Sequence, residues 1–273
     1  AQLDMKLVLV DVQKDALDAA QAQMQTLGAE VMARLVDVSN EGQMQALAND
    51  VQQTFGAPNF VFNNAGVGAG GLVWENTVAD WEWLLGVNLW GVVHGVRLFT
   101  PMMLEAASKD PKFQGHIVNT ASMAGLLTPP NMGIYNVTKH AVVALTETLY
   151  QDLKLVSEQI SASVLCPYFV PTGINQSERN RPANLPPVAA TKSQLIGQAM
   201  SDKAVGSGKV SAEDVAQMVF DAVAADRFYI YSHPKALGNV RLRMDAILNG
   251  DNPPDPFAER PDIGAQLRQA LQD

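Results

Sequence analysis

The chain has 273 residues and a formal net charge of −9 at pH 7, and hydrophobic residues make up 47% of it. This hydrophobic share predicts a globular protein with a buried core, while the acidic balance disfavours nucleic acid and anionic membranes as partners. No apolar run reaches ~18 residues, so no membrane span is expected.

The cysteine and histidine content narrows the class of protein further. Cys166 is the single cysteine, so no intramolecular disulfide is expected, which fits a reducing compartment and predicts a cytoplasmic location. The four histidines are not spaced with carboxylates or cysteines as metal ligands are, and we expect no metal site.

Short apolar, β-branched runs alternate with longer helical patterns along the chain. The runs predict buried strands at 6–11, 31–37, 60–63, 116–119, 163–166 and 228–231. The helical patterns cover about 13–27, 40–55, 79–108, 133–158 and 211–225. Such an alternation favours a parallel sheet with helices on both faces, so the expected fold class is α/β, in three layers.

Two segments depart from this alternation. Residues 171–210 form a proline-containing insertion after a strand end, with a short helical patch near 192–201, and we expect it to be a lid over a site. An ordinary surface excursion is the alternative. Residues 234–273 contain a helical pattern at about 236–248, a proline-rich turn and a final short helix. This tail is expected to be a packing appendage or a subunit contact.

An acid ends the first visible strand. In doubly wound dinucleotide folds, an acid at the end of the second strand accepts hydrogen bonds from the adenosine ribose hydroxyls and would repel a 2′-phosphate. Asp11 stands at such a strand end, and only Lys14 nearby could neutralise that phosphate. The sequence therefore predicts NAD rather than NADP, although a lone acid after a strand is usually only a turn residue.

The next two strand ends carry further candidate contacts. Asp37 and Val38 suit a position near the adenine ring. Asn64, Ala65 and Gly66 close the following strand, and the last two lack bulk, so that the backbone can approach a cofactor closely. A simple tight turn is the alternative for this second group.

Ser122, Tyr135 and Lys139 form the most informative pattern. The tyrosine lies thirteen positions after the serine and four positions before the lysine, which is about one helical turn. A phenol has a pKa of ~10, and a neighbouring ammonium favours the phenolate. A serine hydroxyl at a strand end can then hold a substrate oxygen. The trio therefore predicts proton transfer for a carbonyl/alcohol pair.

The tyrosine–lysine spacing is weak by itself. Tyr150 and Tyr231 also precede a lysine by four positions, but neither has a serine thirteen residues earlier. Only Tyr135 has both partners.

Other residues complete the expected site. Asn88, within the pattern at 79–108, is expected to hold a water that reaches Lys139, although a solvated asparagine is the alternative. The segment from Pro167 to Thr172 follows a strand and offers its backbone and a hydroxyl to a carboxamide. Apolar candidates for a substrate wall, each with core packing as the alternative, are Trp74, Met123, Leu126, Leu127, Met132, Tyr168 and Phe169.

The motifs at 63–66, 88, 122, 135–139 and 167–172 occur in the order and at the spacings of the short-chain dehydrogenase/reductase family, which the chain resembles over about residues 3–235. The resemblance implies one Rossmann-type domain, here 1–273, and a nicotinamide cofactor. It also implies a catalytic group of Asn88, Ser122, Tyr135 and Lys139. The cofactor contacts it implies, together with the strand-end residues, are Asp11, Val12, Asp37, Val38, Asn64, Ala65, Gly66, Thr120, Tyr135, Lys139, Pro167, Tyr168, Val170 and Thr172.

The resemblance also assigns roles. Tyr135 would be the acid/base, Lys139 would hold the nicotinamide ribose and lower the tyrosine pKa, and Ser122 would steady the substrate oxygen. It further implies a homodimer or homotetramer, paired through helices at 87–108 and 133–158.

Two departures from the family pattern stand out. Tyr168 replaces a glycine of the family, so the nicotinamide pocket is expected to have a different shape. The family's opening strand and glycine-rich turn do not occur before Asp11. We expect that this sequence lacks roughly thirty residues of the parent pattern, which would form one strand, turn and helix of a βαβ unit.

The expected function is an NAD-dependent oxidoreductase that interconverts a secondary alcohol and a ketone. The alternative is a catalytically silent relative that senses a dinucleotide or binds a partner, and a purely structural subunit has no sequence feature in its favour. Substrate, direction and pathway stay open.

Overall fold

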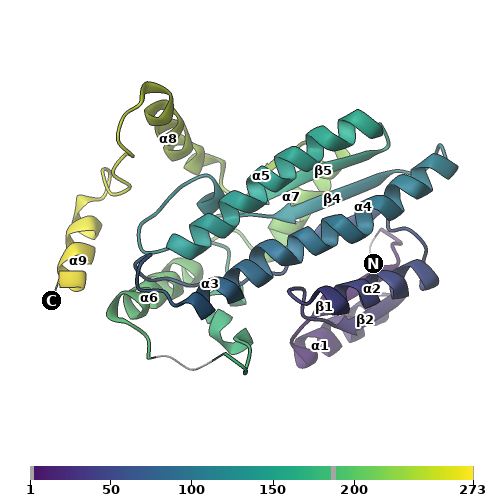
Figure 1. Ribbon diagram of the computed structural model, residues 1–273, viewed down its shortest axis with the longest axis horizontal. Coiled ribbons are helices and arrows are strands. Elements are labelled where there is room, and N and C mark those ends of the chain that lie inside the picture. Colours follow the sequence, from purple (N-terminus) through teal and green to yellow (C-terminus); the bar gives the residue numbers. More distant parts are fainter. Residues whose placement is uncertain (1–2, 186–188, 273) are drawn as a thin grey trace.

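The computed structural model describes residues 3–185 and 189–272 (Figure 1). Its strands are β1 (Leu7–Asp11), β2 (Val31–Leu35), β3 (Phe60–Asn63), β4 (Gly115–Thr120), β5 (Ile160–Cys166) and β6 (Tyr229–Tyr231). The α-helices are α1 (Lys14–Thr26), α2 (Glu41–Thr54), α3 (Val78–Leu85), α4 (Gly91–Lys109), α5 (Gly133–Val156), α6 (Lys192–Gly206), α7 (Ala212–Ala224), α8 (Leu237–Asn249) and α9 (Pro261–Gln272). Shorter turns are η1 (Gly86–Trp90), η2 (Met123–Gly125), η3 (Gly173–Asn180) and η4 (Pro234–Ala236).

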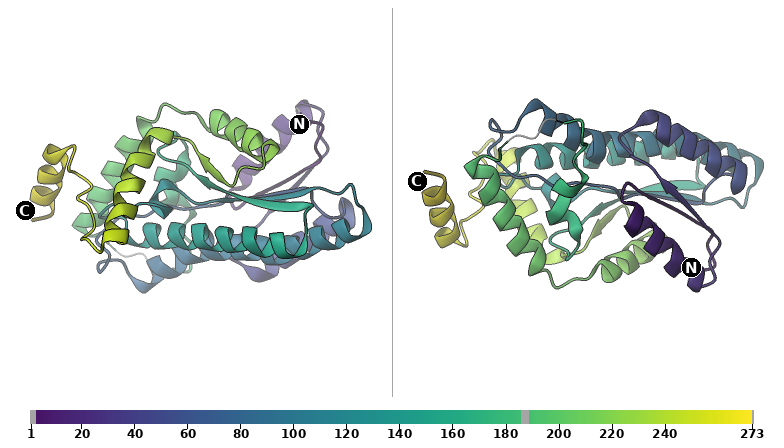
Figure 2. Two further views of the ribbon diagram at one scale, coloured as in Figure 1. Left: turned by 90° about the horizontal axis from the view of Figure 1, so that it is seen from above. Right: turned by 90° about the horizontal axis from the view of Figure 1, so that it is seen from below.

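The strands pair in parallel and lie between two helical layers. The order is β1-β2 in one sheet and β3-β4-β5-β6 in the other. Figure 2 shows these strands between a layer that contains α4 and α5 and a layer that contains α7. The expected three-layer α/β fold with a parallel sheet is therefore confirmed.

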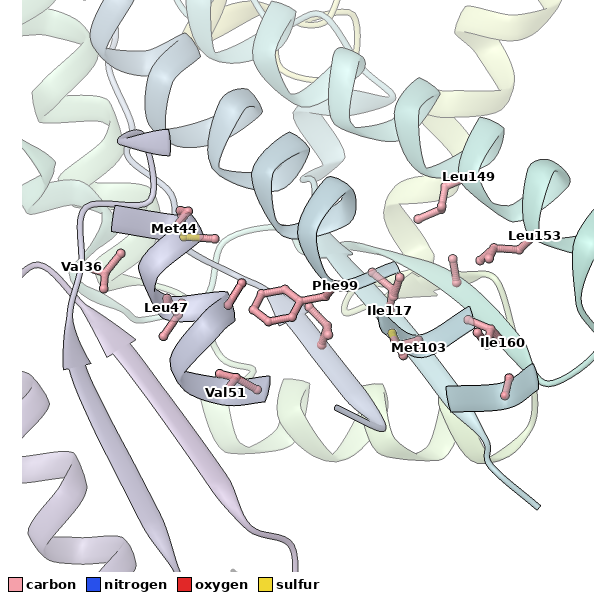
Figure 3. Packing of buried hydrophobic residues seen from close by; sticks show 14 of the residues in the cluster. Val36, Met44, Leu47, Val51, Phe99, Met103, Ile117, Leu149, Leu153 and Ile160 are labelled. Atoms are coloured by element: carbon pink, nitrogen blue, oxygen red, sulfur yellow. The ribbon is translucent and has the colours of Figure 1, made fainter. Parts of the chain in front are cut away.

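Both faces of β4 are buried, which explains its continuous apolar sequence. Ile117 packs into the cluster of α2, α4 and α5, whereas Val118, the next residue, packs against Val215 and Val219 of α7. Successive side chains of a strand point to opposite faces, so two adjacent residues serve two cores. Figure 3 shows the first of these cores, in which Phe99 and Met103 of α4 lie near Ile117.

The edges of β1 and β3 face the same groove. In the described part of the chain no strand pairing joins these edges, and residues of both strands line the opening between them. Phe62 of β3 is accordingly 38% exposed.

Several elements differ from the sequence expectation. The strand expected at 163–166 begins earlier, at Ile160. The strand expected to reach residue 37 ends at Leu35, because Asp37 accepts hydrogen bonds from Ser39 and its own N–H binds the Gln43 side chain. The single helix expected at 79–108 is divided into α3, the π-helical turn η1 and α4. The patch near 192–201 extends into the longer helix α6, which begins with a capping box from Thr191.

The two segments that depart from the alternation of strands and helices form further helices. The 171–210 insertion forms η3 and α6, and its residues 186–188 lie outside the described ranges. The tail forms α8, whose Leu237 and Val240 pack against the core between β5 and α5, and α9, which lies farther from the sheet (Figures 1 and 2). No helix among residues 3–185 and 189–272 is long and apolar enough to cross a membrane.

Candidate active site

The carboxyl ends of β3, β4 and β5 meet at one groove. The register pairs Asn63 with Asn119 and Thr120 with Leu165, so the residues that follow each strand emerge side by side. The Asn63 Nδ2 atom donates to Asn119 Oδ1 at 2.8 Å, which fixes this alignment. This groove and the opening between β1 and β3 form one space of about 2520 Å³, lined at the strand ends by the segments at 64–70, 120–124, 167–170 and 172–175. Ligands of open α/β sheets bind at such strand ends.

Ser122 stands where the chain leaves β4. Its backbone is extended, and its Oγ accepts a hydrogen bond from the Ala124 N–H at 3.1 Å. The same hydroxyl lies 3.4 Å from the Pro167 carbonyl oxygen, on the segment after β5. The Ser122 side chain is thereby directed into the groove that both segments line.

Tyr135 is half-buried on the first turn of α5, and the Ser122 side chain lies beside its phenol. Burial raises the pKa of Tyr135 above its usual value, and hydrogen bonding of the phenolate to Ser122 opposes this shift. The direction differs from the expected lowering by Lys139. The physical reason is that withdrawal from water penalises the phenolate more than the hydrogen bond stabilises it.

Lys139 lies one turn further along α5 and is almost fully buried, with 2% of its surface exposed. Its Nζ donates to the Thr120 carbonyl oxygen at 2.9 Å and lies 5.7 Å from the centre of the Tyr135 ring. Burial lowers the pKa of Lys139 to about 8. The ammonium has three N–H groups, so it keeps donors for a ligand beyond Thr120.

Asn88 lies in η1 and is fully buried. Its Oδ1 accepts from the Val67 N–H at 2.8 Å, and its Nδ2 donates to the Val67 carbonyl at 2.9 Å and to Thr138 Oγ1 at 3.2 Å. These bonds tie the loop after β3 to α5. Asn88 therefore holds protein groups directly, and the alternative of a solvated asparagine is wrong.

The residues around Gly66 fit a cofactor that approaches the backbone. A Cβ atom on Gly66 would stand 3.4 Å from Asn88 Oδ1 and 3.5 Å from Lys139 Nζ, so this glycine keeps the space beside the ammonium open. Asn64 Oδ1 accepts from Thr120 Oγ1 at 3.0 Å, which joins the two strand ends above that space. The remaining N–H groups of Lys139 and the space beside Gly66 suit a ribose with two hydroxyl groups.

The expected adenosine contacts line the far part of the same groove. Asp11 is exposed and its Oδ1 accepts the Gln13 N–H at 2.8 Å. Val12 is 45% exposed beside it. Asp37 Oδ1 instead accepts from the N–H and Oγ of Ser39 at 2.9 and 2.7 Å. Asp37 is therefore held by two groups of Ser39, whereas the Asp11 carboxylate accepts one hydrogen bond, from a backbone N–H.

The segment after β5 is fixed by several contacts. The Pro167 carbonyl accepts from the Met123 N–H at 2.9 Å, and the Tyr168 N–H donates to Ser232 Oγ at 3.0 Å. Val170 is buried, and Thr172 Oγ1 accepts from the Ile174 N–H at 3.4 Å. Tyr168, at the position of the family's glycine, is 44% exposed and lies against the groove.

The apolar wall is smaller than expected. Met123, Leu127, Met132, Tyr168 and Phe169 line the groove. Leu126 belongs to the core between the sheet and α5. The expectation for Trp74 is wrong, because its side chain is 76% exposed and does not line the groove.

Contacts between the insertion and the loop after β3 were missed by the sequence analysis. The Gly68 N–H donates to Ser177 Oγ at 2.8 Å, and Arg181 forms an ion pair with Asp80 at 2.8 Å, with both side chains at least four-fifths buried. Residues of the insertion, among them Ile174, Ser177 and Gln198, also line the groove. These partners are about 100 residues apart, and only the Thr77–Asp80 capping box gave a local signal.

Comparison with known proteins identifies the family. A family model described as short chain dehydrogenase matches residues 1–183. The chain belongs to the short-chain dehydrogenase/reductase family. The curated relatives include a CLA biosynthesis dehydrogenase/reductase of Lactiplantibacillus plantarum, which is 32% identical over 259 residues, or 93% of this chain and 88% of that one.

Solved structures of the short-chain dehydrogenase/reductase family agree in fold. A family member from Burkholderia phymatum, in complex with NAD, is 51% identical with a TM-score of 0.90, over 94% of this chain and 90% of that one. A putative short-chain dehydrogenase from Novosphingobium aromaticivorans is 33% identical with a TM-score of 0.71, over 97% and 88%. The family and the Rossmann-like fold expected from the motifs are thereby confirmed, and this short-chain dehydrogenase/reductase is an oxidoreductase by family.

Proposed function

We propose that the protein is an NAD-dependent oxidoreductase that interconverts a secondary alcohol and a ketone, with Tyr135 as the acid/base. The observation that carries the proposal is the meeting of three groups in one groove: Ser122, Tyr135 and Lys139 all line it, and Lys139 Nζ lies 5.7 Å from the centre of the Tyr135 ring.

Each side chain has a separate task in this proposal. A bound nicotinamide ring supplies or accepts the hydride. Ser122 Oγ donates a hydrogen bond to the substrate oxygen and positions it at the Tyr135 phenol. In ketone reduction the Tyr135 Oη gives its proton to that oxygen, and in alcohol oxidation it takes the proton back. The raised pKa of Tyr135 keeps the phenol protonated at neutral pH, which suits the acid role.

Lys139 and Asn88 support this chemistry. Lys139 donates to the nicotinamide ribose hydroxyls with the N–H groups that Thr120 does not use. Asn88 is a positioning residue, because its amide fixes the Val67 backbone and Thr138 on the helix turn that carries Lys139. The water that the sequence analysis assigned to Asn88 stays a prediction.

The dinucleotide would extend along the groove from Lys139 to Asp11. Asn64, Ala65, Gly66 and Thr120 border its path, and Asp37 with Val38 flanks the adenine end. Pro167, Tyr168, Val170 and Thr172 border the nicotinamide end on the other side. The NAD complex of the 51% identical Burkholderia phymatum protein supports this cofactor.

NAD is the preferred cofactor in this proposal. The Asp11 carboxylate is exposed at the groove and free to accept ribose hydroxyls, and it would repel a 2′-phosphate. Lys14, the nearby cation in sequence, is 2.6 Å from Asp18 and is therefore engaged elsewhere.

The remaining expectations stay predictions. The groove wall of Leu127, Met132 and Phe169 favours a substrate with an apolar body. A homodimer or homotetramer through α4 and α5 is supported by exposed apolar side chains beside and on these helices, Trp90 at 52% and Val137 at 47%. We also propose that the chain forms a single domain and that the protein is cytoplasmic.

The test is a scan of NADH formation and consumption against a panel of secondary alcohols and ketones, using the natural full-length protein. Turnover of at least one pair is expected. NADH binding without turnover of any pair would favour the silent dinucleotide-sensing alternative, and an absence of binding would contradict both.

A further inference from the structure

Arg179 stands in the insertion at the mouth of the groove. Its Nη1 donates to the Gly173 carbonyl at 2.8 Å and to the Gln176 carbonyl at 3.0 Å, so the guanidinium is held by its own turn, η3. Its Nε reaches across the groove and donates to Gln13 Oε1 at 3.1 Å. The side chain therefore connects the insertion to the start of α1, 166 residues away.

The two anchor points of Arg179 adjoin the two ends of the proposed cofactor. Gln13 donates its N–H to Asp11, the proposed contact of the adenosine ribose, at 2.8 Å. Gly173 directly follows Thr172, a proposed contact of the nicotinamide end. The guanidinium lies between these contacts, and the part of a dinucleotide between its two ribose groups is the diphosphate.

The charge on Arg179 is not neutralised by the protein. In residues 3–185 and 189–272 no carboxylate forms an ion pair with it, whereas Arg181, two positions later, is paired with Asp80 at 2.8 Å. Its Nη2 donates no hydrogen bond to these residues, so two N–H groups are left for a ligand. The N–H groups of a charged guanidinium donate strong hydrogen bonds to phosphate oxygens.

We propose that Arg179 binds the diphosphate of the nicotinamide dinucleotide and thereby makes cofactor binding depend on the position of the insertion. This inference rests on the proposed function. The insertion then acts on the cofactor through a charge, in addition to its expected role as a cover for the substrate.

Gly173 provides a second way to test the site without changing any charge. A Cβ atom there would stand 2.5 Å from Arg179 Nη2 and 3.2 Å from its Cζ. Gly173 has no positive φ, and the obstructing atoms are the end of a flexible side chain, so Gly173→Ala should displace the guanidinium and leave the backbone in place.

The experiment measures the dissociation constants of NADH and ADP-ribose, both of which contain the diphosphate, for the natural full-length protein and its variants at several salt concentrations. Arg179→Gln should weaken both ligands by about tenfold or more, which corresponds to about 1.4 kcal/mol, and should reduce the salt dependence of binding. Arg179→Lys should recover part of the loss, and Gly173→Ala should weaken both ligands. Arg241→Gln, an exposed charge on α8, is the matched control and should change neither constant.

The outcomes separate the two proposals. If Arg179→Gln and Gly173→Ala bind both ligands as the unmutated protein does, Arg179 only stabilises its own turn, and this inference is wrong while the proposed function stands. If weakening is confined to NADH and spares ADP-ribose, the diphosphate is not the group recognised. If the unmutated protein binds neither ligand, both proposals are contradicted.

Discussion

The Nζ atom of Lys139 lies 5.7 Å from the centre of the Tyr135 ring, one turn apart on the same buried face of α5. Burial moves their pKa values in opposite directions, down to about 8 for the lysine and upward for the tyrosine. At neutral pH the pair therefore holds a protonated phenol beside a mostly charged ammonium. A protonated phenol is the form that the proposed acid role of Tyr135 in ketone reduction requires.

The buried ammonium should make stability depend on pH in a defined window. Because the folded-state pKa of Lys139 is about 8 against 10.5 ordinarily, the unfolded chain binds more protons between these values. The unfolding free energy should thus rise with pH there, by about 1.4 kcal/mol per unit. Lys139→Met should lack this rise. Denaturant unfolding of the variant and of the unmutated protein at pH 7 to 10 should therefore give unfolding free energies whose difference changes with pH.

Lys154 offers a matched control for this measurement. It lies on the same helix and also follows a tyrosine by four positions, but its side chain is 43% exposed. Lys154→Met should leave the pH profile of stability unchanged. Equal profiles for Lys139→Met and the unmutated protein would mean that Lys139 is not a buried ammonium in the native state.

Asn88 should matter for stability as well as for turnover. Asn88→Ala would leave the buried N–H and carbonyl of Val67 without their partner, at about 1–3 kcal/mol for each unsatisfied group. We expect a loss of roughly 3 kcal/mol in unfolding free energy together with a large loss of kcat. Asn49→Ala, at an exposed position on α2, should cost much less. An Asn88→Ala protein of normal stability would show that these hydrogen bonds are not formed.

Cofactor preference tests the adenosine end of the groove. The unmutated protein should prefer NAD over NADP in kcat/KM by at least roughly tenfold, about 1.4 kcal/mol, because the Asp11 carboxylate would face the 2′-phosphate. Asp11→Ala should narrow this preference, chiefly by weakening NAD. Comparable kcat/KM values for both cofactors in the unmutated protein would contradict the assignment of Asp11.

The opening between β1 and β3 predicts a property of the isolated polypeptide. A polypeptide of residues 1–273 should bind NAD more weakly than micromolar, because the two strand edges beside the proposed cofactor path are not paired with each other in the described ranges. Calorimetric titration of NAD into protein of that intact mass provides the measurement. Micromolar binding together with a cooperative thermal transition would contradict this expectation.

Local patterns were sufficient to predict most of the fold. The runs that predicted β3 and β6 agree with the structure to within one residue, because short runs of aromatic and β-branched residues favour strands. The break of the helix at 79–108 was not predictable from the same pattern. A π-helical turn such as Gly86–Trp90 inserts one residue per turn and redirects Asn88 inward without interrupting the apolar sequence.

The site was predictable where spacing carries the chemistry and not where distant segments meet. Ser122, Tyr135 and Lys139 are joined by one strand end and one helix turn, so their spacing was informative. The contact between Arg179 and Gln13 joins segments 166 residues apart and depends on how the insertion packs. The rise in the Tyr135 pKa was also missed, because burial of a phenol is a property of the packed structure.

The most direct test of the central claim is the steady-state kcat of Tyr135→Phe in the natural full-length protein. The ring is retained and only the Oη atom is lost, so thermal stability should change little while turnover is abolished. Tyr150→Phe is the matched control, since its ring packs on Phe228 at 5.0 Å, in the core and without a serine partner, and it should keep most activity. A Tyr135→Phe protein with near-normal kcat would contradict the assignment of the proton-transfer group.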